Sequence, residues 1–111
     1  MEQQGERRGM GDWHKVAAEA DVTEDEPATA KVADAQIGIF RVDGRLYAIE
    51  DICPHAFAFL SEGFVEGDQV ECPLHEALFH IPTGKCLREP ADRDLQTYEV
   101  KVEDGDVYVR V

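Results

Sequence analysis

The chain has 111 residues, of which 43% are hydrophobic, and its formal net charge is −13. This length allows one domain with a modest core and is too short for a second, catalytic domain. A chain this acidic is a poor partner for nucleic acid or for an anionic membrane, because both carry charge of the same sign. No stretch approaches the roughly eighteen apolar residues that a membrane-spanning helix needs. We therefore expect a cytoplasmic protein.

The first residues, Met1–Asp12, are polar and lack the apolar region of a secretory signal. Either Met1 or Met10 could be the natural start of the chain. The pair Arg7-Arg8 could begin a twin-arginine signal, but no hydrophobic segment follows it. We therefore predict a flexible leader over residues 1–12 and a single domain over residues 13–111.

Apolar–polar alternation with β-branched or aromatic residues predicts six strands. In chain order they are Trp13–Ala18, Thr29–Val32, Ile37–Val42, Arg45–Glu50, Leu95–Val102 and Val107–Val111. Between the first two, residues 19–27 are predicted to form an acidic loop. No window shows the amphipathic stripe of a long helix.

Turn residues separate these runs. Asp43-Gly44 and Asp104-Gly105 predict two-residue hairpin turns, and Glu66-Gly67-Asp68 and Thr83-Gly84 predict further turns. Together, the strands and turns predict an all-β fold: one antiparallel sandwich of small sheets.

The most informative motif is Cys53-Pro54-His55, followed after sixteen residues by Cys72-Pro73-Leu74-His75. Thiolate sulfur suits iron–sulfur and zinc chemistry, and imidazole suits iron, zinc or copper. Each half of the motif supplies one ligand of each kind, which suits two metal ions better than one. Both cysteines can then meet at one iron and both histidines at the other, as in a Rieske [2Fe–2S] centre. A single tetrahedral Zn²⁺ held by the same four residues remains an alternative.

From Trp13 to Val111 the chain resembles the Rieske ferredoxin component of bacterial aromatic-ring-hydroxylating dioxygenase systems. The double Cys-plus-His motif with its spacing is the specific part of this resemblance. The flanking segments that add to it are Leu46-Tyr47-Ala48-Ile49, Leu60-Ser61-Glu62-Gly63, Gly67-Asp68, Glu71, Phe79 and Thr83-Gly84.

The resemblance implies a Rieske-type antiparallel β-sandwich with a cluster-binding subdomain made of two hairpin-like loops. It implies one [2Fe–2S] cluster held by Cys53, His55, Cys72 and His75, with the histidines bound through Nδ1. The protein is then no enzyme but a monomeric one-electron carrier. Its donor is a flavin-containing NAD(P)H reductase and its acceptor is a terminal Rieske oxygenase acting in aromatic catabolism, with an aromatic acid as one substrate class. Alternatives are a Rieske carrier for another oxygenase or redox partner, and a non-redox zinc-binding interaction module.

The chain departs from the Rieske proteins of respiratory complexes, which carry an extra cysteine in each cluster loop and a serine hydroxyl aimed at the cluster. The matching positions are Ala58, Leu74 and Ala77, so neither device is present. Pro54 and Pro73 also lack the N–H groups that could donate near the sulfurs. We therefore predict a reduction potential near the low end of the Rieske range of about −150 to +300 mV.

Other residues near the motif are predicted to be structural. For His80 we expect a hydrogen-bonded structural role rather than a fifth ligand. For Cys86 we expect a small buried hydrophobe. Five apolar side chains are predicted to make the dry packing around the cluster: Phe57, Phe59, Leu60, Phe64 and Phe79.

Charge is unevenly distributed along the chain. The span from Leu46 to Gly84 contains no Lys or Arg but seven carboxylates, namely Glu50, Asp51, Glu62, Glu66, Asp68, Glu71 and Glu76. We predict an acidic docking face around the cluster that speeds encounter with basic partners. The alternative is a solvated acidic surface that only keeps the protein soluble.

Overall fold

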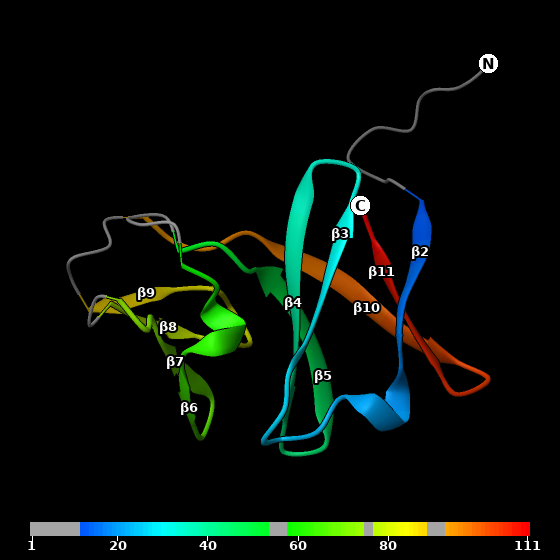
Figure 1. The fold of residues 1–111 in the computed structure, drawn as a ribbon, viewed down its shortest axis with the longest axis horizontal. Coiled ribbons are helices and arrows are strands. Elements are labelled where there is room, and N and C mark those ends of the chain that lie inside the picture. The colour runs from blue at the N-terminus through cyan, green and yellow to red at the C-terminus, as the bar shows by residue number, and fades with distance from the viewer. Residues whose placement is uncertain (1–11, 54–57, 75–76, 89–92) are drawn as a thin grey trace.

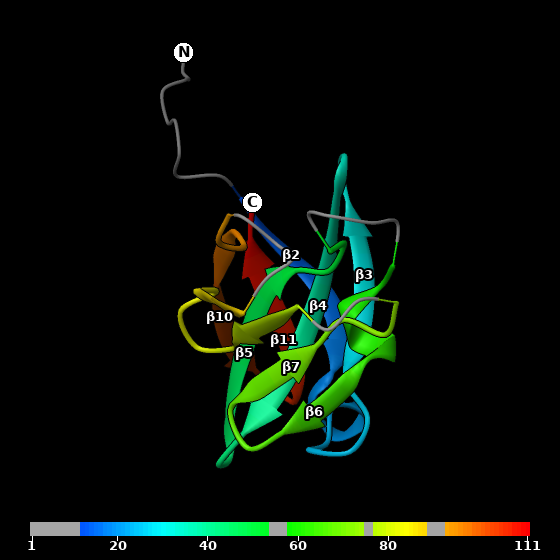
Figure 2. The same ribbon diagram turned by 90° about the vertical axis from the view of Figure 1, so that its left-hand side faces the viewer.

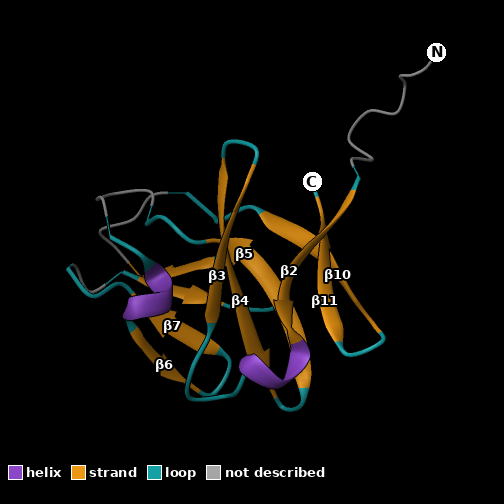
Figure 3. Ribbon diagram, turned by 45° about the vertical axis from the view of Figure 1, so that its right-hand side comes forward, coloured by secondary structure: helices purple, strands orange, loops and turns teal. Residues whose placement is uncertain are grey.

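A computed structural model describes residues 12–53, 58–74, 77–88 and 93–111. These residues form ten strands in two antiparallel sheets, with two short 3₁₀ helices (Figure 1, Figure 3). The large sheet has the strand order β2-β11-β10-β5-β4-β3, and the small sheet has the order β6-β7-β8-β9. In chain order the elements are β2 (Trp13–Ala18), η1 (Glu19–Asp21), β3 (Ala28–Val32), β4 (Ala35–Val42), β5 (Arg45–Glu50), η2 (Leu60–Glu62), β6 (Phe64–Glu66), β7 (Gln69–Glu71), β8 (Leu78–His80), β9 (Cys86–Arg88), β10 (Thr97–Glu103) and β11 (Asp106–Arg110). Among the described residues no helix is long and apolar enough to cross a membrane.

The predicted all-β antiparallel fold is confirmed, and all six predicted strands lie in the large sheet. β2 and β5 have the predicted bounds. β10 begins at Thr97 rather than at Leu95, because the Leu95 N–H donates to the Gly84 carbonyl oxygen (2.7 Å) instead of joining the ladder. β10 pairs with β5 through Thr97 and Tyr98, and its remaining length follows β11 as far as Glu103.

The two Asp-Gly hairpins are confirmed. Asp43 and Gly44 have φ values of 52° and 80°, and Asp104 and Gly105 have 53° and 80°. A positive φ at both central residues is the requirement of a type I′ turn, and Asp-Gly meets it well. The β3–β4 hairpin instead turns through Ala33 at φ 54°. A side chain with a Cβ in this left-handed region costs about 1–2 kcal/mol.

The segment predicted as an acidic loop, residues 19–27, contains the short helix η1. Arg41 of β4 reaches this segment: its Nε donates to the Val22 carbonyl oxygen (2.7 Å), and its Nη2 lies 3.7 Å from a Glu19 carboxylate oxygen. Arg41 therefore ties this segment to β4. Because Arg41 is about twenty residues away in the chain, the local sequence pattern could not reveal this contact.

The small sheet consists of strands of three residues each, β6 to β9, which the sequence pattern did not delimit. Period-2 alternation needs more residues than this to be recognised. The predicted turns at Gly67 and Gly84 lie between β6 and β7 and between β8 and β9, and both glycines have positive φ. The hairpin-like character of this region is thus confirmed.

Two hydrophobic cores hold the molecule together, and β4 lies between them. Ile37 and Ile39 belong to the core of the large sheet, whereas Phe40 and Val42 belong to the core shared with the small sheet. Both faces of β4 are therefore covered, which explains why residues 37–40 are all buried. Figures 1 and 2 show the small sheet beside the large one, so that the two sheets form one body.

The predicted leader lies outside the described residues except for Asp12. The Asp12 N–H donates to the Val111 carbonyl oxygen (3.0 Å), and the Val111 N–H donates to the Asp12 carbonyl oxygen (3.1 Å). The first and last described residues therefore adjoin, as Figure 1 also shows.

Candidate metal centre

The two predicted thiolate ligands are buried in the core shared by the two sheets. Cys53 follows Ile52, which forms an isolated β-bridge with Phe59, and Cys72 directly follows β7. Only 2% of Cys53 and 1% of Cys72 is exposed. His55 and His75 lie outside the described residues, so the four-residue ligand set stays a prediction.

The same backbone hydrogen bond closes the two cysteine-bearing segments, residues 53–58 and 72–77. The Cys53 N–H donates to the Ala58 carbonyl oxygen (2.9 Å), and the Cys72 N–H donates to the Ala77 carbonyl oxygen (2.9 Å). Each segment therefore begins at a buried cysteine, returns to the core five residues later, and contains one predicted histidine ligand. We call them the first and second ligand segments.

The first ligand segment is anchored by Asp51, whose side chain is fully buried. Its Oδ1 accepts the Ser61 N–H (2.8 Å), and its Oδ2 accepts the Ser61 hydroxyl (2.8 Å). Its backbone N–H donates to Gln36, and its carbonyl oxygen accepts the Leu60 N–H. Burial raises the pKa of Asp51 to about 6, although the two hydrogen bonds from Ser61 act in the opposite direction.

Asp51 therefore does not belong to an exposed docking face, and that part of the prediction is wrong. Its carboxylate lies against Gly38 of β4, where a Cβ would come within 2.8 Å of Oδ1. Only a residue without a side chain allows this approach.

The second ligand segment emerges from the small sheet, where His80 holds two turns together. The Nε2 of His80 lies 3.0 Å from Oδ2 of Asp68, and its Nδ1 lies 2.8 Å from Oγ1 of Thr83. These contacts confirm that His80 is a hydrogen-bonded structural histidine.

Cys86, on the edge strand β9, packs against the core but is only half-buried. Its N–H donates to Asp94 Oδ1 (2.8 Å), and its Sγ lies 3.6 Å from the Arg88 carbonyl oxygen. The expectation of a small buried hydrophobe is therefore met only in part, because an edge strand leaves one side of Cys86 open.

The aromatic packing predicted around the cluster is only partly present. Leu60 and Phe79 are fully buried beneath the ligand segments. Phe59 and Phe64, by contrast, are 40% and 67% exposed. Phe57 lies outside the described residues.

Most of the described carboxylates predicted to form an acidic face have a partner within the protein. The pairs are Glu50 with Arg93 (2.7 Å), Glu71 with Arg88 (3.4 Å) and Asp68 with His80 (3.0 Å). Among the described residues, Glu62 and Glu66 make no ion pair, and Glu76 lies outside them. Two carboxylates of this span, Glu50 and Glu71, are therefore balanced by an arginine from outside it.

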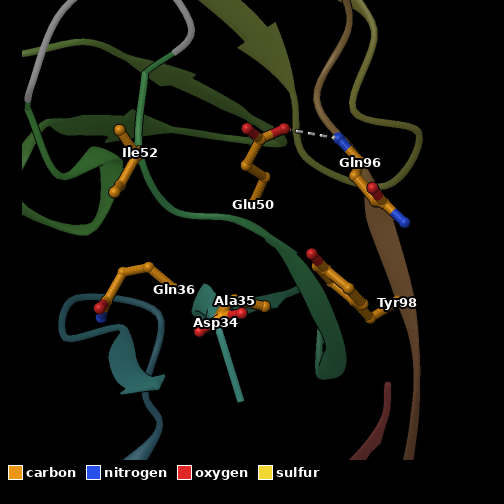
Figure 4. A pocket seen from close by; sticks show the side chains of 7 residues that line it. All are labelled: Asp34, Ala35, Gln36, Glu50, Ile52, Gln96 and Tyr98. Atoms are coloured by element: carbon orange, nitrogen blue, oxygen red, sulfur yellow. Dashed lines mark hydrogen bonds between the residues drawn. The ribbon is translucent and has the colours of Figure 1, made fainter. Parts of the chain in front are cut away.

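Glu50 borders a shallow cavity of about 230 Å³ between the β3–β4 turn, the end of β5 and the start of β10 (Figure 4). Burial alone raises the pKa of Glu50, but hydrogen bonds from Arg93 and the Gln96 N–H, together with the Arg93 charge, outweigh it and lower the pKa. Burial, and then the charge of Glu50, raise the pKa of the nearby Tyr98. The residues around the cavity are Asp34, Ala35, Gln36, Glu50, Ile52, Gln96 and Tyr98.

The described donor set fits a cluster with thiolate ligation on one side. Two buried cysteines stand at the bases of two matching segments, and none of the chain's three cysteines forms a disulfide. Within residues 12–53, 58–74, 77–88 and 93–111, no three His, Cys, Asp or Glu side chains come together to hold a metal ion. Because both predicted histidine ligands lie outside these ranges, this finding does not bear on the four-residue set.

The comparisons with protein families and curated proteins agree. The family model described as Rieske [2Fe–2S] domain matches residues 12–99. The chain is 40% identical to the anthranilate 1,2-dioxygenase ferredoxin subunit of Burkholderia cepacia, over 92% of this chain and 94% of the relative. It is 47% identical to the 3-phenylpropionate/cinnamic acid dioxygenase ferredoxin subunit of Escherichia coli, over 81% of this chain and 85% of the relative.

Solved structures show the same fold. One is the ferredoxin in a complex of reduced oxygenase and oxidized ferredoxin of carbazole 1,9a-dioxygenase, with a TM-score of 0.81 and 38% identity over 88% of this chain and 92% of that chain. Another is a ferredoxin of Sphingomonas yanoikuyae B1, with a TM-score of 0.85 and 29% identity over 90% of this chain and 99% of that chain.

Proposed function

We propose, from the premise that this chain belongs to the Rieske [2Fe–2S] family, that it is a ferredoxin of an aromatic-ring-hydroxylating dioxygenase system. It passes electrons one at a time to the terminal oxygenase and catalyses no reaction itself. The observation that carries this proposal is the nearly end-to-end match with a dioxygenase ferredoxin subunit, 92% of one chain and 94% of the other.

The cofactor is one Rieske [2Fe–2S] cluster, which takes up and releases a single electron when bound. We assign Cys53 and Cys72 to one iron and His55 and His75 to the other. The burial of both cysteines and the matching closure of the two ligand segments support this assignment. The apolar core around the cysteines keeps water from the thiolates, and a neutral imidazole adds no charge to the site.

We propose a flavin-containing NAD(P)H reductase as the electron donor. The chain has no glycine-rich dinucleotide-binding fingerprint, so it must receive its electrons from another protein. The carrier is expected to be monomeric and cytoplasmic, and both remain predictions.

The aromatic substrate follows from the oxygenase and not from this chain. The relatives belong to systems named for anthranilate, for 3-phenylpropionate or cinnamic acid, and for naphthalene. A carrier that never touches the substrate can serve all of these, although the match with the anthranilate system agrees with the expectation of an aromatic acid.

The test is electron paramagnetic resonance of the dithionite-reduced protein, together with iron and sulfide analysis. We expect two irons and two sulfides per chain and the low average g value of a reduced cluster with nitrogen ligands. A silent sample with one zinc ion per chain would instead establish the interaction module. A variant with Ser at both His55 and His75 should lose the nitrogen-ligated signal, whereas His14→Ser, outside the site, should keep it.

A further inference from the structure

The two strands that lead into the ligand segments end in the same way. β5 ends at Glu50, three residues before the first ligand segment, and β7 ends at Glu71, directly before the second. Oε2 of Glu50 lies 2.7 Å from Nη2 of Arg93. Oε1 of Glu71 lies 3.4 Å from Nη2 of Arg88. One carboxylate–guanidinium pair therefore stands at the end of each strand that leads into a cysteine-bearing segment.

Both arginines come from neighbouring stretches of the chain. Arg88 is the last residue of β9, and Arg93 lies shortly before β10. The N–H of Cys86 on β9 donates to Oδ1 of Asp94 (2.8 Å), the residue after Arg93. This hydrogen bond holds the two arginine-bearing stretches beside each other. A single place in the fold therefore supplies one arginine to the strand that leads into each ligand segment.

The two arginines bring positive charge to a part of the chain that has no Lys or Arg, the span from Leu46 to Gly84. Within the part of the chain that the structure describes, the carboxylates of this span form ion pairs with no Lys or Arg besides Arg88 and Arg93. Arg93 also changes the electrostatics at the end of β5. Burial raises the pKa of Glu50, but hydrogen bonds from Arg93 and from the backbone, together with the charge of Arg93, lower it overall.

We propose that Arg88 and Arg93 set the reduction potential of the cluster, by placing one positive charge beside the strand that leads into each ligand segment. The inference rests on the cluster assigned under the proposed function. Reduction adds one electron, and therefore one negative charge, to the cluster. A fixed positive charge favours the more negative of two charge states, and the glutamate paired with it favours the less negative one. Removing either partner alone therefore shifts the potential, and removing both leaves it nearly unchanged.

The test is potentiometric titration of the holo-protein at neutral pH, followed by paramagnetic resonance of the reduced cluster. We compare Arg88→Gln, Arg93→Gln, Arg88→Lys and Arg93→Lys with the wild type. Arg45→Gln is the matched control, because it removes the same charge at the exposed first residue of β5, roughly 17 Å along the strand from Glu50. Glu50→Gln and Glu71→Gln, each alone and combined with the change of its arginine, complete a double-mutant cycle for each pair.

The expected shifts are small, because the side chains of Arg88 and Arg93 are 47% and 54% exposed and solvent screens their charge. Each change of arginine to glutamine should move the redox equilibrium about two- to threefold toward the oxidised form, or about 20–30 mV at about 59 mV per tenfold change. Each change of glutamate to glutamine should move it the opposite way by a similar factor. The lysine variants and the double variants should stay close to the wild type. All shifts should shrink at about 1 M salt, where the Debye length is about 3 Å.

Shifts for Arg88→Gln and Arg93→Gln no larger than that of Arg45→Gln overturn the inference, while the cluster and the proposed function stand. Equal shifts for the lysine and glutamine variants also overturn it, because the lost geometry and not the lost charge would then be the cause. If a glutamine variant does not retain the cluster, the glutamate change of the same pair decides, and an unchanged potential there overturns the inference. A wild-type protein without the nitrogen-ligated signal contradicts the proposed function itself, and the inference falls with it.

Discussion

Asp51 is the residue that fixes the start of the first ligand segment. Both of its carboxylate oxygens accept hydrogen bonds from Ser61, which lies beyond the end of that segment. One fully buried side chain therefore joins the two ends of the segment. A buried carboxylate is costly unless its oxygens are satisfied, so Ser61 matters as much as Asp51 itself.

Replacing Ser61 with Ala removes the hydroxyl that donates to Asp51 Oδ2 and keeps the backbone hydrogen bond. Because a buried polar atom that loses its partner costs roughly 1–3 kcal/mol, we expect the free energy of unfolding to fall by this amount. The measurement is the urea midpoint, followed by the visible absorbance of the cluster. Thr29→Ala, at an exposed position of β3, is the control. A midpoint for S61A equal to that of the wild type would contradict the prediction.

Glu50 makes stability depend on pH. Its two carboxylate oxygens accept hydrogen bonds from the two terminal nitrogens of Arg93 (3.1 and 2.7 Å), and the Gln96 N–H donates to Oε1 (3.1 Å). The pKa of Glu50 in the folded protein is thereby lowered from its ordinary value of 4.5. Its contribution to stability is therefore present above pH 4.5 and lost as the pH falls through the folded pKa.

We expect Glu50→Gln to be less stable than the wild type at neutral pH, by about 1 kcal/mol or less because the pair is partly exposed. The difference should shrink on acidification below about pH 4.5. Thermal unfolding of both proteins between neutral pH and about pH 3 measures this. Glu66→Gln, which removes a carboxylate without an ion pair among the described residues, should show no such convergence. If the difference in stability between Glu50→Gln and the wild type does not change with pH, Glu50 does not stabilise the protein through its charge.

At the scale of elements, the approach of η2 and β6 to the second ligand segment depends on Gly63. A Cβ at this position would overlap the carbonyl oxygen of Glu71 and lie 3.1 Å from Cδ of Pro73. Backbone atoms cannot swing aside as the end of a side chain can. The close approach of these elements is therefore possible only with glycine.

Gly63→Ala should accordingly push apart the elements that carry the two ligand segments. We expect a loss of about 3 kcal/mol or more in the free energy of unfolding and faster loss of the cluster. Gly67→Ala is the matched control, since its φ is +62° but nothing lies near its Cβ position. Gly67→Ala should lower the free energy of unfolding by only about 1–2 kcal/mol, through backbone strain. Equal urea midpoints for the two variants would contradict the prediction, because the clash at Gly63 would then cost no more than the backbone strain at Gly67.

For the whole molecule, charge governs how readily the protein accepts an electron. The net charge is −13, Ala77 has no hydroxyl, and Pro73 has no N–H to donate. Each of these disfavours the reduced, more negative form. The arginines that pair with Glu50 and Glu71 are already counted in this net charge, so their pairing does not weaken the first effect.

We expect a midpoint potential between about −150 and 0 mV, in the lower part of the Rieske range. Potentiometric titration of the holo-protein at neutral pH, followed by paramagnetic resonance, measures it. The Val102→Ser protein, altered far along β10, should give the same value. A midpoint clearly above zero would show that some donor to the sulfurs outweighs the negative charge.

The sequence by itself determined those features of the fold and of the site that depend only on residues close together in the chain. Strands such as Arg45–Glu50 are long enough for apolar–polar alternation to be recognised. The pair Asp43-Gly44 readily adopts the two positive φ values that a type I′ turn requires. The mixed Cys and His motif likewise indicated a Rieske cluster, because ligand chemistry and spacing are local properties. The family and the cofactor followed from these, and the histidine ligands remain a prediction.

Only the tertiary structure decided which groups face water. Glu50 and Arg93 are 43 residues apart in the chain, so no local pattern could show that they pair. The same holds for Asp51, which looks like one of several acidic residues until β4 and η2 close over it. Phe59 was predicted to pack around the cluster, yet it is 40% exposed and lines a surface groove together with Leu74. Burial depends on contacts between elements that are distant in the chain, so no short stretch of the sequence shows which side chains are buried.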